Sequence, residues 1–120
     1  MSVRPFISVV LNLTFNKGHF KMAKFAFHVE LKSKPGKESE VEAFLKQGAA
    51  MAKAEAGAVS WYGLKEEDKP GVYGIFDTFN DEVGRDAHLK GELAKALMGR
   101  AAELFAEAPR IHRLHVVAEK

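Results

Sequence analysis

The sequence has no cysteine among its 120 residues, and it has only one tryptophan and four prolines. Without cysteine, disulfides, thiolate catalysis and cysteine-ligated zinc or iron–sulfur centres are all excluded. The sequence also lacks a large excess of either sign of charge, because it has 18 Lys and Arg against 16 Asp and Glu. The basic residues are scattered along the chain. Phosphate binding needs clustered cations, so nucleic acid is not an expected partner. The lack of cysteine fits a reducing cytoplasm, which is the expected location.

Long hydrophobic runs are absent as well. Residues 6–15 form a short apolar, β-prone run, whereas a membrane-spanning helix needs roughly 20 apolar residues. No membrane anchor is therefore expected, and residues 16–21 make a poor signal-peptide cleavage region. Met22 reads as a second start. We interpret residues 1–21 as an N-terminal extension, either an extra strand or an upstream leader, and residues 22–120 as one domain of ordinary size.

Hydrophobic periodicity predicts the first half of this domain. Phe25, Phe27, Val29 and Leu31 alternate with mostly polar neighbours, which is typical of a strand with one apolar face. Residues 37–55 are predicted to form an amphipathic helix, with Gly57 as its left-handed C-cap. The apolar stripe of this helix is Val41, Phe44, Leu45, Gly48, Met51 and Ala52.

The second half predicts a hairpin, a helical region and a final strand. Residues 59–67 and 72–79 are short strands joined by turn residues. Residues 81–107 are predicted to be helical with a break near Gly91, because glycine disfavours a helix interior. Residues 111–118 then form the last strand.

This order predicts an α+β fold, namely a ferredoxin-like β-α-β-β-α-β domain with an antiparallel four-stranded sheet and its helices on one face. The other sheet face would expose a large apolar surface, which favours a homodimer in which two sheets close an α/β barrel. The residues expected on that face are Trp61 or Tyr62, Phe76 or Phe79, and Leu114 with Val116.

Four pieces in this order carry a family resemblance: Lys-Pro-Gly-Lys at 34–37, Ala-Glu-Ala-Gly at 54–57, the aromatic-ended strand at 73–79, and Ala-His-Leu at 87–89. Together they resemble the antibiotic biosynthesis monooxygenase family of dimeric α/β-barrel proteins. The resemblance implies the same fold and the oxidation of quinols, anthrones or similar aromatics by dioxygen, without metal or organic cofactor. Relatives degrade haem, and many have no known activity. The family usually ends the third strand in acid-x-Trp, whereas this chain has Phe79.

The resemblance leaves His88 and Asp77 as the candidate catalytic residues. An imidazole titrates near neutrality, so His88 is suited to take a proton from an acidic phenol. Asp77 is expected either to orient His88 or to pair with Arg85. The structural alternatives are a histidine that packs the helix on the sheet and a salt bridge at a strand end.

Aromatic residues are the candidate substrate-binding residues. Trp61 and Tyr62 point to opposite faces of one strand, so one of them is expected in the pocket. Phe79 and His28 complete the predicted substrate-binding set, although most aromatics at such positions belong to the core.

Metal and nucleotide sites are not expected. His112 and His115 are three residues apart on a strand and project from opposite faces. His28 is able to join one of them from a neighbouring strand, but the sequence offers no carboxylate at an obvious spacing. The glycines are isolated, and no G-x-G-x-x-G opens a helix. The expected cofactor set is therefore empty.

The leading prediction is a homodimeric, cofactor-independent monooxygenase of a small phenolic, quinol or anthrone-like substrate, with dioxygen as co-substrate. A second hypothesis is a non-catalytic dimeric barrel that binds a small hydrophobic metabolite or serves a stress response, and the missing tryptophan favours it. A third is haem binding or haem breakdown.

Overall fold

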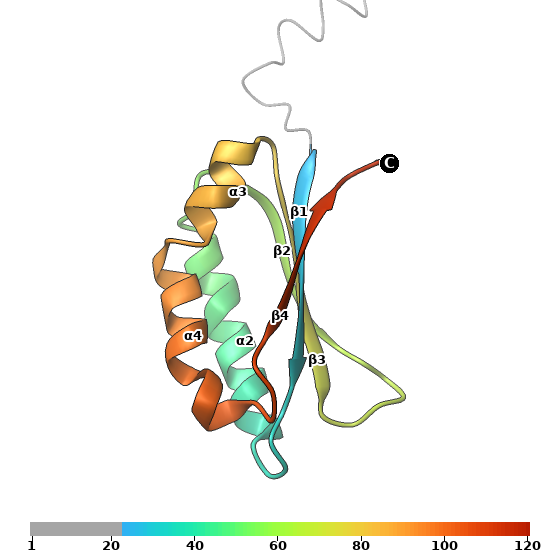
Figure 1. Ribbon diagram of the computed structural model, residues 1–120, viewed down its shortest axis with the longest axis vertical. Helices are drawn as coiled ribbons and strands as arrows, with labels where there is room; N and C mark the ends of the chain where they lie inside the picture. Colours follow the sequence, from blue (N-terminus) through green and yellow to red (C-terminus); the bar gives the residue numbers. More distant parts are fainter. Residues whose placement is uncertain (1–22) are drawn as a thin grey trace, which may run out of the picture.

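The computed structural model describes residues 23–120, so the predictions for residues 1–21 lie outside the described residues. One antiparallel sheet in the strand order β2-β3-β1-β4 carries three helices on one of its faces (Figure 1). This arrangement confirms the predicted α+β, ferredoxin-like class. The elements in chain order are β1 (Phe25–Lys32), α2 (Glu38–Ala52), β2 (Ala58–Lys65), β3 (Val72–Phe79), α3 (Glu82–His88), α4 (Glu92–Leu104) and β4 (Arg110–His115).

Strand β1 lies between β3 and β4 in the sheet. Val29 is paired with Ile75 of β3 and with Ile111 of β4. The period-two alternation sends Phe27, Val29 and Leu31 toward the helices, where all three are buried in the main hydrophobic core. The intervening residues of β1, such as His28, point to the opposite face. The helices leave that face of the sheet open (Figure 1).

Helix α2 follows the predicted apolar stripe but ends earlier than predicted. Its buried residues are Val41, Phe44, Leu45, Gly48 and Ala52. The predicted left-handed cap at Gly57 is wrong, because the positive-φ glycines among residues 23–120 are Gly36 and Gly71, both in Pro-Gly turns. Gly57 instead lies against α3, where a Cβ on it would stand 3.0 Å from the Gly84 Cα. Its lack of a side chain therefore serves a close backbone approach.

The predicted break in the second helical region is confirmed. Asp81 caps α3 by accepting a 2.7 Å hydrogen bond from the Gly84 backbone amide. Gly91 separates α3 from α4 in an extended conformation. Helix α4 ends at Leu104 rather than at residue 107, because Phe105 leaves the helix and bridges to Ser33 beside β1. Two successive helices, α3 and α4, therefore lie beside α2 on the helical side of the sheet (Figure 1).

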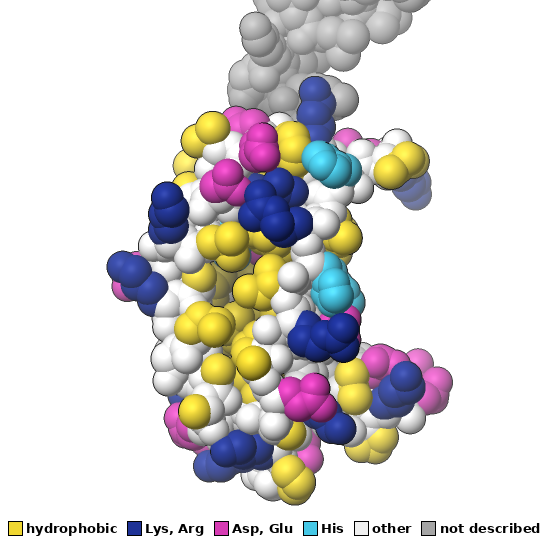
Figure 2. Space-filling view, in the orientation of Figure 1, with side chains coloured by type: hydrophobic (Ala, Val, Ile, Leu, Met, Phe, Trp, Pro, Cys, Tyr) yellow, Lys and Arg dark blue, Asp and Glu magenta, His cyan; other side chains and the backbone are white. Residues whose placement is uncertain are grey.

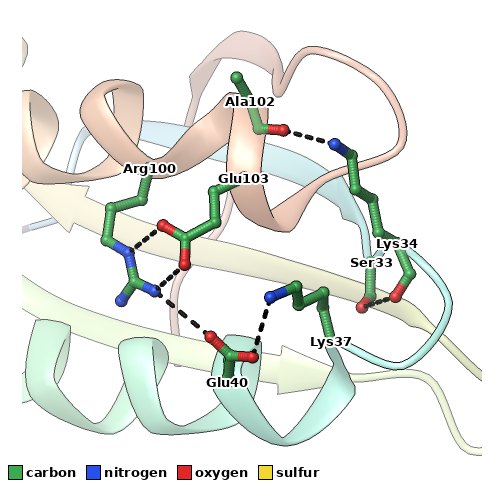
Figure 3. A network of polar contacts seen from close by, with 7 residues as sticks. All are labelled: Ser33, Lys34, Lys37, Glu40, Arg100, Ala102 and Glu103. Carbon is green, nitrogen blue, oxygen red and sulfur yellow. Dashed lines mark hydrogen bonds and ion pairs between the residues drawn. The ribbon is translucent and has the colours of Figure 1, made fainter.

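A polar network holds one end of the helical layer together (Figure 3). The Lys34 Nζ donates to the Ala102 carbonyl at 2.6 Å, which ties the loop after β1 to α4. The Arg100 guanidinium pairs with Glu103 at 2.9 Å on its own helix and lies 3.6 Å from Glu40 of α2. These ion pairs are partly exposed, so they orient the two helices more than they stabilise them.

Strand β4 is shorter than predicted. It begins at Arg110 and ends at His115 instead of running to residue 118. Beyond His115 the partner strand ends, and the last backbone bond in this region joins the Val116 amide to the Lys24 carbonyl at 2.8 Å. The C-terminal residues after it are exposed. Among residues 23–120, no helix is long and apolar enough to cross a bilayer.

The open sheet face carries part of the predicted apolar set. Tyr62 and Phe76 are paired across β2 and β3 on this face, and Leu114 of β4 shares it. Tyr62 is 56% exposed and Leu64 is also exposed. Trp61 and Phe79, the other members of the predicted pairs, face the helices instead.

The Gly57–Gly84 contact predicts the effect of one added methyl group. The change Gly57→Ala should lower the free energy of unfolding by about 1–3 kcal/mol, because the new Cβ meets the Gly84 backbone rather than a movable side chain. Chemical denaturation measures the effect. The matched control is Gly99→Ala, whose Cβ enters open space within α4 and should raise stability by up to about 1 kcal/mol. Equal stabilities for both variants would contradict the close approach.

Candidate active site

Asp77 is a buried acid at the centre of the sheet. Alternation along β3 places it on the helix-facing side, between Phe27 of β1 and Trp61 of β2. Asp77 is only 1% exposed, and neither of its carboxylate oxygens has a hydrogen-bond partner among the described residues. A carboxylate in such a position is costly unless a nearby group compensates it.

His88 is that neighbouring group. It is the last residue of α3, and its Nε2 lies 3.0 Å from the Asp77 Oδ2. The two atoms are within ion-pair distance but are not aligned for a hydrogen bond. On its other side, the His88 Nδ1 lies 2.5 Å from the Glu55 Oε1. The imidazole therefore stands between two carboxylates, one buried and one, on Glu55, 23% exposed.

Two phenylalanines fix the position of this imidazole. The ring centroid of His88 lies 5.2 Å from that of Phe79 and 6.2 Å from that of Phe27. The His88 side chain is only 10% exposed. Phe79 and Phe27 also contact each other edge-to-face at 5.8 Å, so the ring lies against a rigid aromatic wall.

Burial and charge act in opposite directions on the two titrating groups. Burial raises the pKa of Asp77, and the adjacent His88 offsets this only in part. Burial lowers the pKa of His88, but contacts with the Asp77 and Glu55 carboxylates outweigh it, and the pKa is raised overall. The folded protein therefore holds protons at this site more tightly than free side chains would. Perturbed pKa values of this kind are common at functional sites.

A small apolar cavity of about 30 Å³ adjoins Asp77 and His88. Figure 2 shows hydrophobic side chains gathered between the helical layer and β4. Residues of both elements, among them Leu93 of α4 and Ile111 of β4, line this cavity. Its other lining includes Trp61, whose Nε1 is buried without a partner among the described residues. A donor and an acceptor without partners thus belong to residues that line the same cavity, and such groups call for an explanation.

The sequence-predicted residues divide between the two faces of the sheet. His88, Asp77, Trp61 and Phe79 lie together on the helix-facing side. Tyr62 and His28 lie on the open face, away from His88, so their predicted role in substrate binding remains a prediction unconnected to this site.

Arg85 does not take the alternative role of an Asp77 partner. Its guanidinium donates to the Leu114 carbonyl at 3.1 Å and lies 3.7 Å from Glu82. It also lies over the Phe25 ring at 5.0 Å. Of the two expected partners, the structure places His88 beside Asp77.

Glu55 is the member of this site that sequence reasoning missed. It lies in the turn after α2, 33 positions before His88. The Ala-Glu-Ala-Gly segment served in the sequence only as a landmark after the first helix. No local spacing connects Glu55 to His88, because only the packing of α3 against this turn joins them.

Comparisons with known proteins identify a relative of this chain among the solved structures. No protein-family model matches it, and no curated protein sequence matches it. A solved structure, the NE2512 protein of unknown function from Nitrosomonas europaea, is 42% identical, with a TM-score of 0.78; the match covers 84% of this chain and 96% of that one.

Two further solved structures carry the name "putative antibiotic biosynthesis monooxygenase". The protein from Caulobacter crescentus is 23% identical with a TM-score of 0.71, covering 88% of this chain and 99% of that one. The protein from Nitrosomonas europaea is 14% identical with a TM-score of 0.72, covering 82% of this chain and 95% of that one. At these identities they show the fold alone. The chain thus belongs to the family of the NE2512 protein and has the fold of the antibiotic biosynthesis monooxygenases.

Proposed function

We propose that this protein is a cofactor-independent monooxygenase of a small phenolic, quinol or anthrone-like substrate. The observation that carries the proposal is the buried His88 imidazole between the Asp77 and Glu55 carboxylates, beside an apolar cavity. The names of two neighbours that share the fold support the same reaction class. In this chemistry the protein has three tasks, which are to remove a proton, to orient the substrate and to exclude water.

The proton acceptor is the Asp77–His88 pair. Both ring nitrogens of His88 are engaged by carboxylates, whereas the Asp77 Oδ1 is buried and has no partner among the described residues. A substrate hydroxyl at Asp77 would give its proton to that carboxylate. A neutral His88 would take the proton at Nε2 and release its Nδ1 proton to Glu55. Glu55, which is partly exposed, then connects the imidazole to solvent. His88 thus acts as the base together with Asp77.

The remaining chemistry belongs to the substrate and dioxygen. The deprotonated substrate supplies the electrons that reduce dioxygen. On an anthrone-like substrate a CH2 group becomes C=O, and on a quinol one ring C–H becomes C–OH while the ring itself is oxidised to the quinone. In both cases the substrate supplies all four electrons and the second oxygen atom leaves as water, so no external reductant is needed. The Trp61 Nε1, a buried donor without a partner among the described residues, is suited to hold a substrate oxygen.

Substrate entry requires movement at the cavity mouth. A space of about 30 Å³ is enough for a water molecule and not for an aromatic ring. Leu89 and Ile111 line the cavity and are also exposed large hydrophobic residues. Their displacement would open the cavity between α4 and β4 without disturbing the buried strands.

We also propose a homodimer in which the open sheet faces of two chains pack together. Tyr62 and Leu64 are exposed on this face, and Phe76 of β3 and Leu114 of β4 share it. Exposed apolar residues gathered on one sheet face are typical of an interface.

A non-catalytic binder of a small hydrophobic metabolite is the second candidate function. The apolar lining of the cavity favours this function. So does Phe79, which ends β3 where the antibiotic biosynthesis monooxygenase family usually has a tryptophan. In that case Asp77 and His88 would serve only to recognise a polar group of the ligand.

Oxygen consumption by metal-free protein, measured against quinols, hydroxynaphthalenes and anthrones, tests the proposed activity. The changes Asp77→Asn and His88→Gln should each lower the rate by about 100-fold or more, the size of a general-base contribution. The control Asp86→Asn makes the same chemical change at an exposed residue of α3 and should leave the rate intact. No uptake by folded wild-type protein would favour the binder, and equal rates in all variants would remove Asp77 and His88 from the reaction.

Sedimentation equilibrium tests the dimer. Wild-type protein should sediment as a dimer at micromolar concentration, and Leu64→Glu should weaken the association by at least tenfold, because it adds a charge to the proposed interface. The change Val83→Glu, at an exposed apolar residue of the helical layer, is the control and should remain dimeric. A wild-type monomer would contradict this use of the open face.

The raised pKa of His88 predicts a pH-dependent stability. Below pH 6.5 both folded and unfolded chains hold the proton, and the stabilising contribution of the charged imidazole is complete. As the pH rises through the raised folded pKa this contribution is lost, by about 1.4 kcal/mol per unit of pKa difference. Urea unfolding of wild-type protein and His88→Gln across this range should show their stability difference shrinking with pH. A constant difference would show that His88 is not charged in the fold.

A further inference from the structure

A second cluster of ionisable side chains lies on the open face of the sheet. His28 of β1 is paired directly with His112 of β4, and Glu30 is two positions from His28, so all three project from the same face. Each offers a ligand atom, and these atoms lie within 4.8 Å of one another. Among residues 23–120, no other group of three or more His, Asp or Glu side chains has a spacing that suits a metal ion.

The contacts within the cluster already orient its members. The His112 Nε2 lies 2.6 Å from the Glu30 Oε2, and the rings of His28 and His112 are stacked with centroids 5.8 Å apart. The Arg110 guanidinium lies 3.7 Å from the other Glu30 oxygen. The contacts with His112 and Arg110 thus fix the position of the Glu30 carboxylate on this face of the sheet.

The sheet also leaves room beside the cluster. Gly74 is the β3 residue opposite Glu30, and a Cβ on it would stand 3.5 Å from the His28 Nε2. A hollow of about 330 Å³ is lined by His28, Glu30 and Arg110, among other residues, and continues toward the end of β1. In the single chain, water and ions therefore have access to His28 and Glu30 through this hollow.

We propose that His28, Glu30 and His112 form a binding site for a divalent first-row transition metal ion, with Zn²⁺ as the best match. Two imidazoles and one carboxylate are a ligand set that zinc accepts, and three protein ligands leave one position open to water or another ligand. Ligand atoms around zinc at about 2.0–2.1 Å are roughly 3.3 Å apart, so modest side-chain rotations close this cluster. The ion would replace the His112–Glu30 hydrogen bond.

The sequence analysis predicted no metal site, so this proposal departs from that prediction. His115 does project from the other face, where its ring lies 5.4 Å from that of Phe25. The missing carboxylate is Glu30, on the same strand as His28 rather than on β4. The proposal is independent of the proposed oxygenase activity, because Asp77 and His88 lie on the opposite side of the sheet.

Isothermal titration of the full chain, treated with a chelator and then dialysed, with Zn²⁺ tests the proposal. We expect one Zn²⁺ per chain and at least a tenfold loss of affinity in His112→Ala and in Glu30→Gln. His115→Ala is the matched control, since it removes a histidine from the same strand but from the other face, and its affinity should equal that of the wild type. Mg²⁺, which prefers oxygen ligands, should not compete.

Co²⁺ provides a second readout that does not depend on affinity alone. Its visible absorption should be that of a bound, low-coordinate ion with wild-type protein, and should change in Glu30→Gln, which retains a hydrogen-bonding side chain beside His112. Absence of Zn²⁺ binding, or equal binding in the ligand variants and in His115→Ala, would overturn the proposal. Equal binding everywhere would mean that other histidines hold the ion.

Discussion

The pairing of β1 on both sides is the constraint on which the rest of the structure depends. Each residue from Phe25 to Glu30 is bonded into ladders with β3 and with β4. Since the side-chain period of a strand is two, this double pairing assigns every residue of β1 to one face. Phe27 and Val29 enter the core, and His28 and Glu30 enter the open face. A slip by one residue would exchange the two sets and destroy both candidate sites.

The helix-facing site keeps a buried acid where an apolar side chain would be expected. Asp77 occupies the same row of β3 as Ile75 and Phe79, and it lacks good hydrogen bonds among the described residues. Burial of a carboxylate disfavours the fold unless a partner compensates, and His88 provides that compensation only in part. A sequence selected for stability alone has little reason to retain such a group, and this is the physical argument for a function at Asp77.

The position of His88 depends on a backbone contact one turn earlier in α3. Gly57 and Gly84 approach closely, which brings α3 against the turn that follows α2. The same approach carries Glu55 to His88. The aromatic wall of Phe27 and Phe79 then limits the ring to one orientation. Preorganisation of this kind allows a proton acceptor to work without rearrangement. The two faces of one sheet thus carry separate groups of ionisable side chains, with Asp77, His88 and Glu55 on one side and His28, Glu30 and His112 on the other.

The sequence by itself determined the class of fold, the apolar stripe of α2 and the break at Gly91, because periodicity and turn residues act over a few neighbouring positions. Asp77 and His88 became candidates through the family resemblance of their local segments, which periodicity does not reveal. The helix end at Ala52, the short β4 and the true role of Gly57 depended on where neighbouring elements stop. Only the tertiary structure decided that Glu55 joins His88, that Tyr62 and His28 face away from it, and that Glu30 completes a cluster with His112. Those contacts join residues 33 and 82 positions apart, and no local pattern records which faces meet when the sheet forms.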